Sequence, residues 1–124
     1  MDTPPKDVTY RARPGEHAVI VEDHRTRHIG ILPNHGNHSP DGHSWGYGGS
    51  GPAQLAKDIL WDHLGEAPHP ACYQDFKEDM VASVPMNAPF RRTSEEVDGW
   101  LVSWRAQNPN TPYRAIDFPE EAEA

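Results

Sequence analysis

Polar and apolar residues alternate near the start of the chain, in the pattern of a half-buried β-strand. Val8, Tyr10 and Ala12 are separated by polar residues, and a Pro-Gly pair follows as a turn signal. Two further short runs are rich in β-branched and apolar residues. We expect the first two segments to pair as an antiparallel hairpin and the third to complete a small meander. The predicted strands are residues 7–13, 18–21 and 28–32.

Three later segments repeat apolar residues at three- and four-residue spacings, which is typical of amphipathic helices. The first has a proline in its first turn, follows a cap at Ser50 or Gly51, and ends before Gly65. Thr93 and Glu96 form a capping box at the start of the third. The predicted helices are residues 52–64, 70–84 and 94–107.

Strand segments precede helical segments, and this order predicts an α+β fold. We expect an N-terminal antiparallel β-meander with about three helices packed on one face. A last extended segment, residues 113–118, is a candidate for one more strand at the sheet edge. The length of 124 residues suits a single domain over residues 1–124, with residues 1–6 and 119–124 expected to fray.

Composition and charge narrow the functional classes. The formal net charge is −8, so direct nucleic-acid binding is not expected, because that affinity rests on Lys and Arg; a basic protein partner suits the chain better. No run approaches the roughly 20 apolar residues that cross a membrane, and residues 1–6 lack the apolar core of a signal peptide. We therefore expect a cytoplasmic protein without membrane contact. The lone Cys72 excludes an internal disulfide and any paired-cysteine zinc motif.

A loop rich in His, Asn, Ser and Gly precedes the first predicted helix, and it is the main candidate site. Small residues directly before a helix N-terminus leave backbone N–H groups and the helix dipole free to attract an anion. Aromatic rings in the same loop offer stacking surfaces for a nucleotide-like ligand. The candidate ligand-binding residues are Asn37, His38, Ser39, Trp45, Tyr47, Gly48, Gly49, Ser50 and Gln54.

The same loop has two other interpretations. Its glycines allow a tight turn, and Trp45 and Tyr47 would then pin the loop to the core. Its histidines offer a zinc site, with His35, His38 and His43 as candidate ligands, although no helical spacing fixes their geometry. No other cofactor is expected.

This loop contains residue types that a catalytic site could use, but not in a recognisable catalytic arrangement. Ser39 or Ser50 could combine with His38 or His43 and with Asp41, but no spacing supports a nucleophile elbow or a triad. We assign no catalytic residue, and an enzyme is the less favoured class.

The run Asn37-His-Ser-Pro-Asp-Gly-His-Ser-Trp-Gly-Tyr-Gly-Gly-Ser-Gly-Pro-Ala-Gln-Leu-Ala56, followed by Tyr73-Gln-Asp-Phe-Lys77, resembles the DUF6166 family, a family of small proteins of unknown function. The resemblance is specific over residues 37–84 and extends more loosely to Trp100. It implies no reaction. It does imply a context, because the family occurs in bacteria, phages and other mobile elements, whose small proteins often bind host machinery.

Three hypotheses of function follow from these observations. The first is a non-catalytic binding protein of phage or mobile-element origin, an anti-CRISPR-like inhibitor whose acidic surface contacts a host defence complex. The second is a module that sequesters a nucleotide, a signalling molecule or another small phosphorylated ligand at the Gly-rich loop. The third is a zinc-dependent enzyme of the His loop. The sequence leaves the oligomeric state open.

Overall fold

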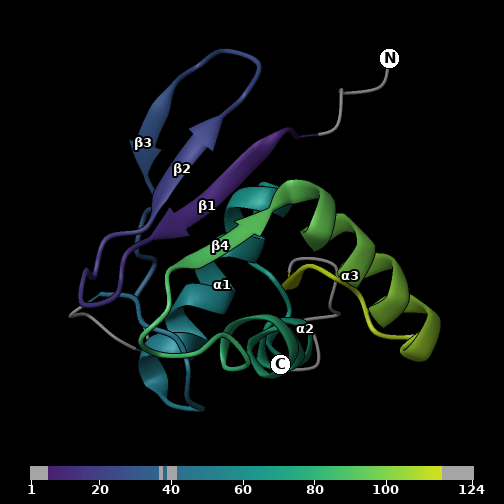
Figure 1. The fold of residues 1–124 in the computed structure, drawn as a ribbon. Coiled ribbons are helices and arrows are strands. Elements are labelled where there is room, and N and C mark those ends of the chain that lie inside the picture. The colour runs from purple at the N-terminus through teal and green to yellow at the C-terminus, as the bar shows by residue number, and fades with distance from the viewer. Residues whose placement is uncertain (1–5, 37, 39–41, 116–124) are drawn as a thin grey trace.

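An antiparallel sheet of four strands is one layer of the computed structural model, which describes residues 6–36, 38 and 42–115 (Figure 1). Within these residues the strands lie in the order β3-β2-β1-β4. The strands are β1 (Val8–Ala12), β2 (Ile20–Asp23), β3 (Ile29–Ile31) and β4 (Phe90–Thr93). The first three form the predicted meander, since β1 pairs with β2 and β2 with β3, both antiparallel.

The fourth strand was not predicted from the sequence. β4 pairs antiparallel with β1 and places Phe90 opposite Ala12 and Arg91 opposite Arg11. Its two adjacent arginines hide the period-two pattern, and only Phe90, with none of its surface exposed, marks the buried face. The suggested edge strand at residues 113–118 was wrong for its described part, because Arg114 forms an isolated bridge with Pro68 instead. Residues 116–118 lie outside the described residues.

The helices are α1 (Ser50–Leu64), α2 (Pro70–Phe76) and α3 (Ser94–Gln107), and a π-helical turn, η1 (Lys77–Val81), directly continues α2. The N-cap of α1 is Gly49, so a cap at Ser50 or Gly51 was wrong by one or two positions. The C-cap at Gly65, in the left-handed conformation, and the capping box of Thr93 are confirmed. The predicted second helix is therefore an α-helical and a π-helical segment in series.

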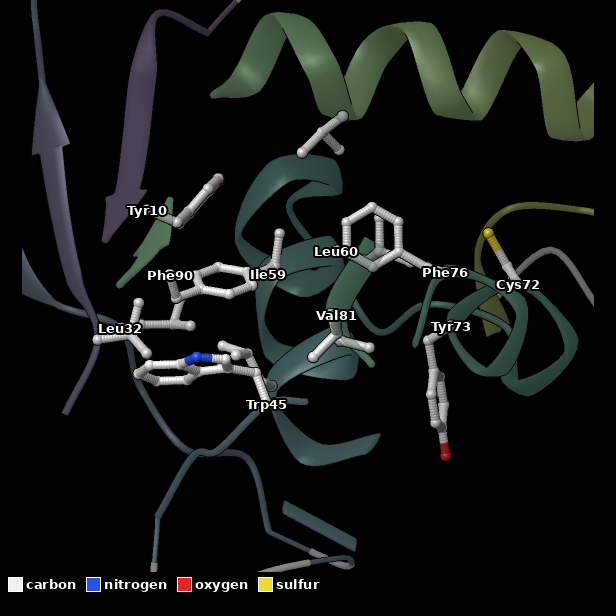
Figure 2. Close-up of a cluster of buried hydrophobic side chains, with 14 of the residues drawn as sticks. Tyr10, Leu32, Trp45, Ile59, Leu60, Cys72, Tyr73, Phe76, Val81 and Phe90 are labelled. Atoms are coloured by element: carbon white, nitrogen blue, oxygen red, sulfur yellow. The ribbon is translucent and has the colours of Figure 1, made fainter. Parts of the chain in front are cut away.

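One hydrophobic cluster joins the sheet to the helices. Val8, Tyr10 and Ala12 project from β1 toward the helices. Figure 2 shows Tyr10, Phe90 and Leu32 from the sheet side facing Ile59 of α1, with Phe76 of the α2 segment farther along the same core. The fold is α+β, as predicted. None of the helices in the described part of the chain is long and apolar enough to cross a membrane.

Candidate functional site

The loop between β3 and α1 is anchored in the core by Trp45. This side chain is only 3% exposed, packs against Phe90 with the ring centroids 5.5 Å apart, and donates its indole N–H to the carbonyl of Ala88 at 3.0 Å. Trp45 therefore has a structural role, because it ties the loop to the core.

The glycines of the loop allow close packing. Gly46 has a φ of +91°, and a Cβ atom there would lie 2.6 Å from the backbone of Met86. A Cβ on Gly49 would lie 2.5 Å from the Tyr47 ring, whereas one on Gly48 would meet nothing within 4 Å. Tyr47 thus folds back over the helix start.

The first turn of α1 is covered by side chains of the same loop. The Tyr47 hydroxyl lies 2.9 Å from Ser44 Oγ, and a Cβ on Gly51 would lie only 1.8 Å from that same Oγ. Ser50 itself is exposed. An anion approaching the helix N-terminus would have to displace Ser44 and Tyr47, so the loop is not preformed as an anion cradle.

A buried carboxylate on α1 holds the rest of the loop. Asp58 has no exposed surface and accepts hydrogen bonds from the backbone N–H of His35 at 3.1 Å and from the side-chain amide of Gln54 at 3.0 and 3.1 Å. His43 Nε2 lies 2.6 Å from the second Asp58 oxygen. Gln54 also accepts the backbone N–H of His38 at 2.9 Å. Gln54 is fully buried and joins loop to helix.

The three histidines proposed as zinc ligands have different partners. The His35 ring stacks on Trp61 at 3.7 Å, and His38 Nε2 lies 2.6 Å from the Tyr73 hydroxyl. His43 pairs with Asp58. Among the described residues no three His, Cys, Asp or Glu side chains are grouped so as to hold a metal ion. Asn37, Ser39 and Asp41 lie outside the described residues.

Positive charge gathers beside His38, where α1, α2 and η1 meet. Lys57 is only 7% exposed, and its ammonium lies 5.8 Å from the ring centroids of both Trp61 and Tyr73. The Lys77 side chain is 12% exposed and pairs with Glu78 at 3.3 Å. We refer to Lys57, Lys77, His38 and Tyr73 together as the Lys57 cluster.

The ionisation of the cluster reflects this positive charge. Burial, followed by the charges of Lys57 and Lys77, lowers the pKa of His38 below its ordinary value, and the charge of Asp58 only partly offsets this. Burial also raises the pKa of Tyr73 above its ordinary value. At neutral pH the cluster therefore contains a neutral imidazole and a neutral phenol beside its two lysines.

Lys57, Asp58 and Trp61 were not predicted from the sequence to be site residues. A signal was present, because Gln54, Lys57, Asp58 and Trp61 follow helical spacings of three, four and seven residues along α1. This spacing places the four side chains along one side of α1, next to the apolar face of the helix. Only the path of the loop shows that this side is covered rather than exposed.

One family model matches the chain. It is described as a family of unknown function, DUF6166, and matches residues 8–103. The matched range runs from β1 into α3 and includes every residue of the Lys57 cluster as well as the His43–Asp58 pair. No curated protein and no solved structure matches the chain.

The packing of the loop can be tested by replacing two of its glycines with alanine. We expect Gly46→Ala to lower the free energy of unfolding by about 1–3 kcal/mol or more, because its Cβ meets the Met86 backbone and its φ is positive. Gly48→Ala is the matched control and should change stability little, since no atom lies near its Cβ. Urea denaturation measures both, and equal stability of the two variants would contradict the close packing.

Proposed function

The chain belongs to the DUF6166 family, and from this premise we propose that it is a non-catalytic protein that binds a small phosphorylated ligand at the Lys57 cluster. The observation that carries the proposal is a nearly buried lysine, Lys57, whose ammonium lies over two aromatic rings and has no carboxylate partner among the described residues. The proposed location is the cytoplasm, where such ligands are available.

Lys57 is an unusual residue in its surroundings. Lysine is almost never nearly buried unless its charge is paired, because burial removes the water that stabilises the ammonium. Here two aromatic rings provide cation–π attraction, but they accept no conventional hydrogen bond from the ammonium. A phosphate oxygen would supply both the missing charge and the missing acceptor.

The neighbours of Lys57 suit an anion. Lys77 contributes a second ammonium, and its position at the start of η1 follows from the π-helical turn, a feature that occurs frequently at functional sites. His38 is held by a backbone bond to Gln54 and by Tyr73, so its ring is fixed next to the two lysines. Of the loop residues first considered as ligand-binding, His38 is the one that this proposal retains.

Inorganic phosphate, measured by isothermal titration calorimetry at constant ionic strength, tests the site. We expect Lys57→Met to weaken phosphate binding by about tenfold or more, because it removes the ammonium and keeps an apolar stem of similar shape. Lys6→Met is the matched control, since Lys6 pairs with Asp62 outside the cluster. Lys77→Met serves as a second variant if Lys57→Met proves unstable in urea.

Two results would contradict the proposal. One is the absence of any saturable heat when wild-type protein is titrated with phosphate. The other is a Lys57→Met variant that is folded and binds phosphate as tightly as the wild type. AMP and adenosine, compared under the same conditions, show whether the phosphoryl group carries the affinity.

Anion binding to the cluster should depend on pH through His38. A bound dianion favours the protonated imidazole, whose pKa is lowered in the free protein, so binding takes up a proton. Sulfate, which stays fully ionised, should therefore bind about threefold or more tightly as the pH falls from about 7.5 to 5.5, on either side of the ordinary histidine pKa. His38→Gln should remove this dependence. If the sulfate affinity of the wild type does not change with pH, His38 has no role in binding.

The lowered pKa of His38 also determines how the stability of the folded state changes with pH. The unfolded chain takes up the His38 proton at a higher pH than the folded chain does. The contribution of neutral His38 to stability is therefore present above the ordinary histidine pKa and is lost as the pH falls below it. Sulfate titrations at low pH thus need folded-state controls.

A second candidate function is inhibition of a host defence complex through an acidic helical surface. The elements α2, η1 and α3 carry six acidic and two basic residues. Asp75 and Asp79 accept the indole N–H groups of Trp104 and Trp100, each at 2.8 Å, so acids and aromatic rings are held on adjoining helices. Acids around a half-buried tryptophan suit a basic protein surface. The acidic residues are Asp75, Glu78, Asp79, Glu95, Glu96 and Asp98.

Charge reversal tests this second candidate. With a panel of purified CRISPR effector complexes in biolayer interferometry, we expect the double change Glu78→Lys and Glu95→Lys to slow association about tenfold at low salt and to affect dissociation little. Glu16→Lys, on the sheet side of the molecule, is the matched control. If no complex is bound, or if reversal leaves association unchanged, the acidic surface is not an inhibitory one.

A further inference from the structure

His43 has one ring nitrogen that no described residue of the loop or the core accounts for. The side chain is 3% exposed, its backbone N–H donates to the carbonyl of His17 at 3.1 Å, and its Nε2 lies 2.6 Å from Asp58. Its Nδ1 is buried and has no hydrogen-bond partner among the described residues. Hydrogen bonds of its backbone N–H and its Nε2 thus fix His43 in place, while its Nδ1 has none among the described residues.

The missing partner stands out because the rest of this network is complete. Both oxygens of Asp58 accept hydrogen bonds, and Gln54 both donates and accepts. A carboxylate only accepts, so its partner Nε2 is the donor of this pair, and in the tautomer that this pairing selects Nδ1 is an acceptor. Buried polar atoms of this kind normally have a partner in the protein, in water or in a ligand.

A pocket of about 190 Å³ lies beside this ring. Trp45 and Tyr47 provide aromatic walls, and Met86 adds a thioether side chain that suits aromatic rings. Tyr47 is 44% exposed and Met86 58% exposed, so both form the rim, while His43 and Trp45 are buried in the wall. We refer to it as the His43 pocket, which is lined by Gly15, Glu16, His17, His43, Ser44, Trp45, Tyr47 and Met86.

We propose that the His43 pocket binds a planar heteroaromatic ring of nucleobase size, whose N–H edge donates to His43 Nδ1. The pocket is smaller than the roughly 300–1,000 Å³ of sites for drug-sized ligands, which limits it to a small ring. Aromatic and sulfur-containing walls favour a planar π-system over an aliphatic chain. The single buried acceptor supplies orientation, as one well-placed polar group does in an apolar site.

A neighbouring hollow also borders His43 and provides the internal comparison. It measures about 430 Å³ and includes Ile31, Leu32 and Pro33 in its wall. None of its lining residues is a Trp, Tyr or Phe, so it lacks the stacking surfaces of the His43 pocket. Ile31 is 68% exposed, which makes it a safe position for a control substitution.

The test is a titration of ¹⁵N-labelled protein with free adenine, guanine, cytosine and uracil, followed by the imidazole nitrogen signals in long-range ¹H–¹⁵N NMR spectra. We expect at least one base to shift the Nδ1 signal of His43 in a saturable way. Tyr47→Ala should weaken this binding by about fivefold or more, in the range for loss of base–aromatic stacking, and Tyr47→Phe should restore it. Met86→Ala is the second rim variant.

The controls make each outcome decisive. Ile31→Ala and Lys57→Met should leave base binding unchanged, because they lie outside the His43 pocket, so a failed anion site leaves this test intact. If no base moves the Nδ1 signal, the proposal is overturned. A shift of equal size with benzene would overturn the role of the polar edge. Weakening by Ile31→Ala but not by Tyr47→Ala would place the ring in the neighbouring hollow instead.

Discussion

The buried carboxylate of Asp58 organises the loop and both candidate sites. A carboxyl group without exposed surface is costly to bury unless its oxygens have hydrogen-bond partners, and here Gln54, His43 and the backbone of His35 are those partners. Each of these donors belongs to α1 or to the loop before it. The carboxylate therefore fixes the path of the loop across the helix, and the loop in turn excludes water from the carboxylate.

The two candidate sites lie on branches of this one network. Through Gln54 the carboxylate positions the backbone of His38, whose ring meets Tyr73 beside Lys57. Through its second oxygen it orients His43, whose Nδ1 has no hydrogen-bond partner in the described part of the chain. Because one buried group holds both branches, a change at Asp58 would alter the two sites together and would not separate their roles.

Local charge in this protein differs from its net charge. The chain is acidic overall, at −8, yet two ammonium groups and a histidine converge where α1, α2 and η1 meet. Asp75 of α2 and Asp79 of η1 accept hydrogen bonds from the two indoles of α3. An anion site and an acidic surface can therefore coexist, since the field at a partly buried point depends on its nearest groups.

Local chemistry explains what could be read from the chain itself. The alternation around Tyr10 predicted the first strand of the meander. Gly65 predicted the end of α1, and the capping box of Thr93 predicted the start of α3. These predictions were possible because each signal acts within a few residues. The Gly-rich loop was recognised as distinctive for the same reason. Its glycines, however, serve contacts with Met86, Tyr47 and Ser44 that the chain does not reveal.

The sequence by itself determined the α+β class, most element boundaries and membership of a family; only the tertiary structure decided where chemistry is possible. β4 has too few apolar positions to show its period and exists because β1 offers an edge to pair with. Lys57 and Asp58 look like surface residues of a helix until the loop covers them. Burial depends on contacts between distant segments. The burial of Lys57 without a carboxylate partner, and of His43 Nδ1 without a hydrogen-bond partner, both as far as the described residues go, is therefore a property of the fold and not of any local pattern.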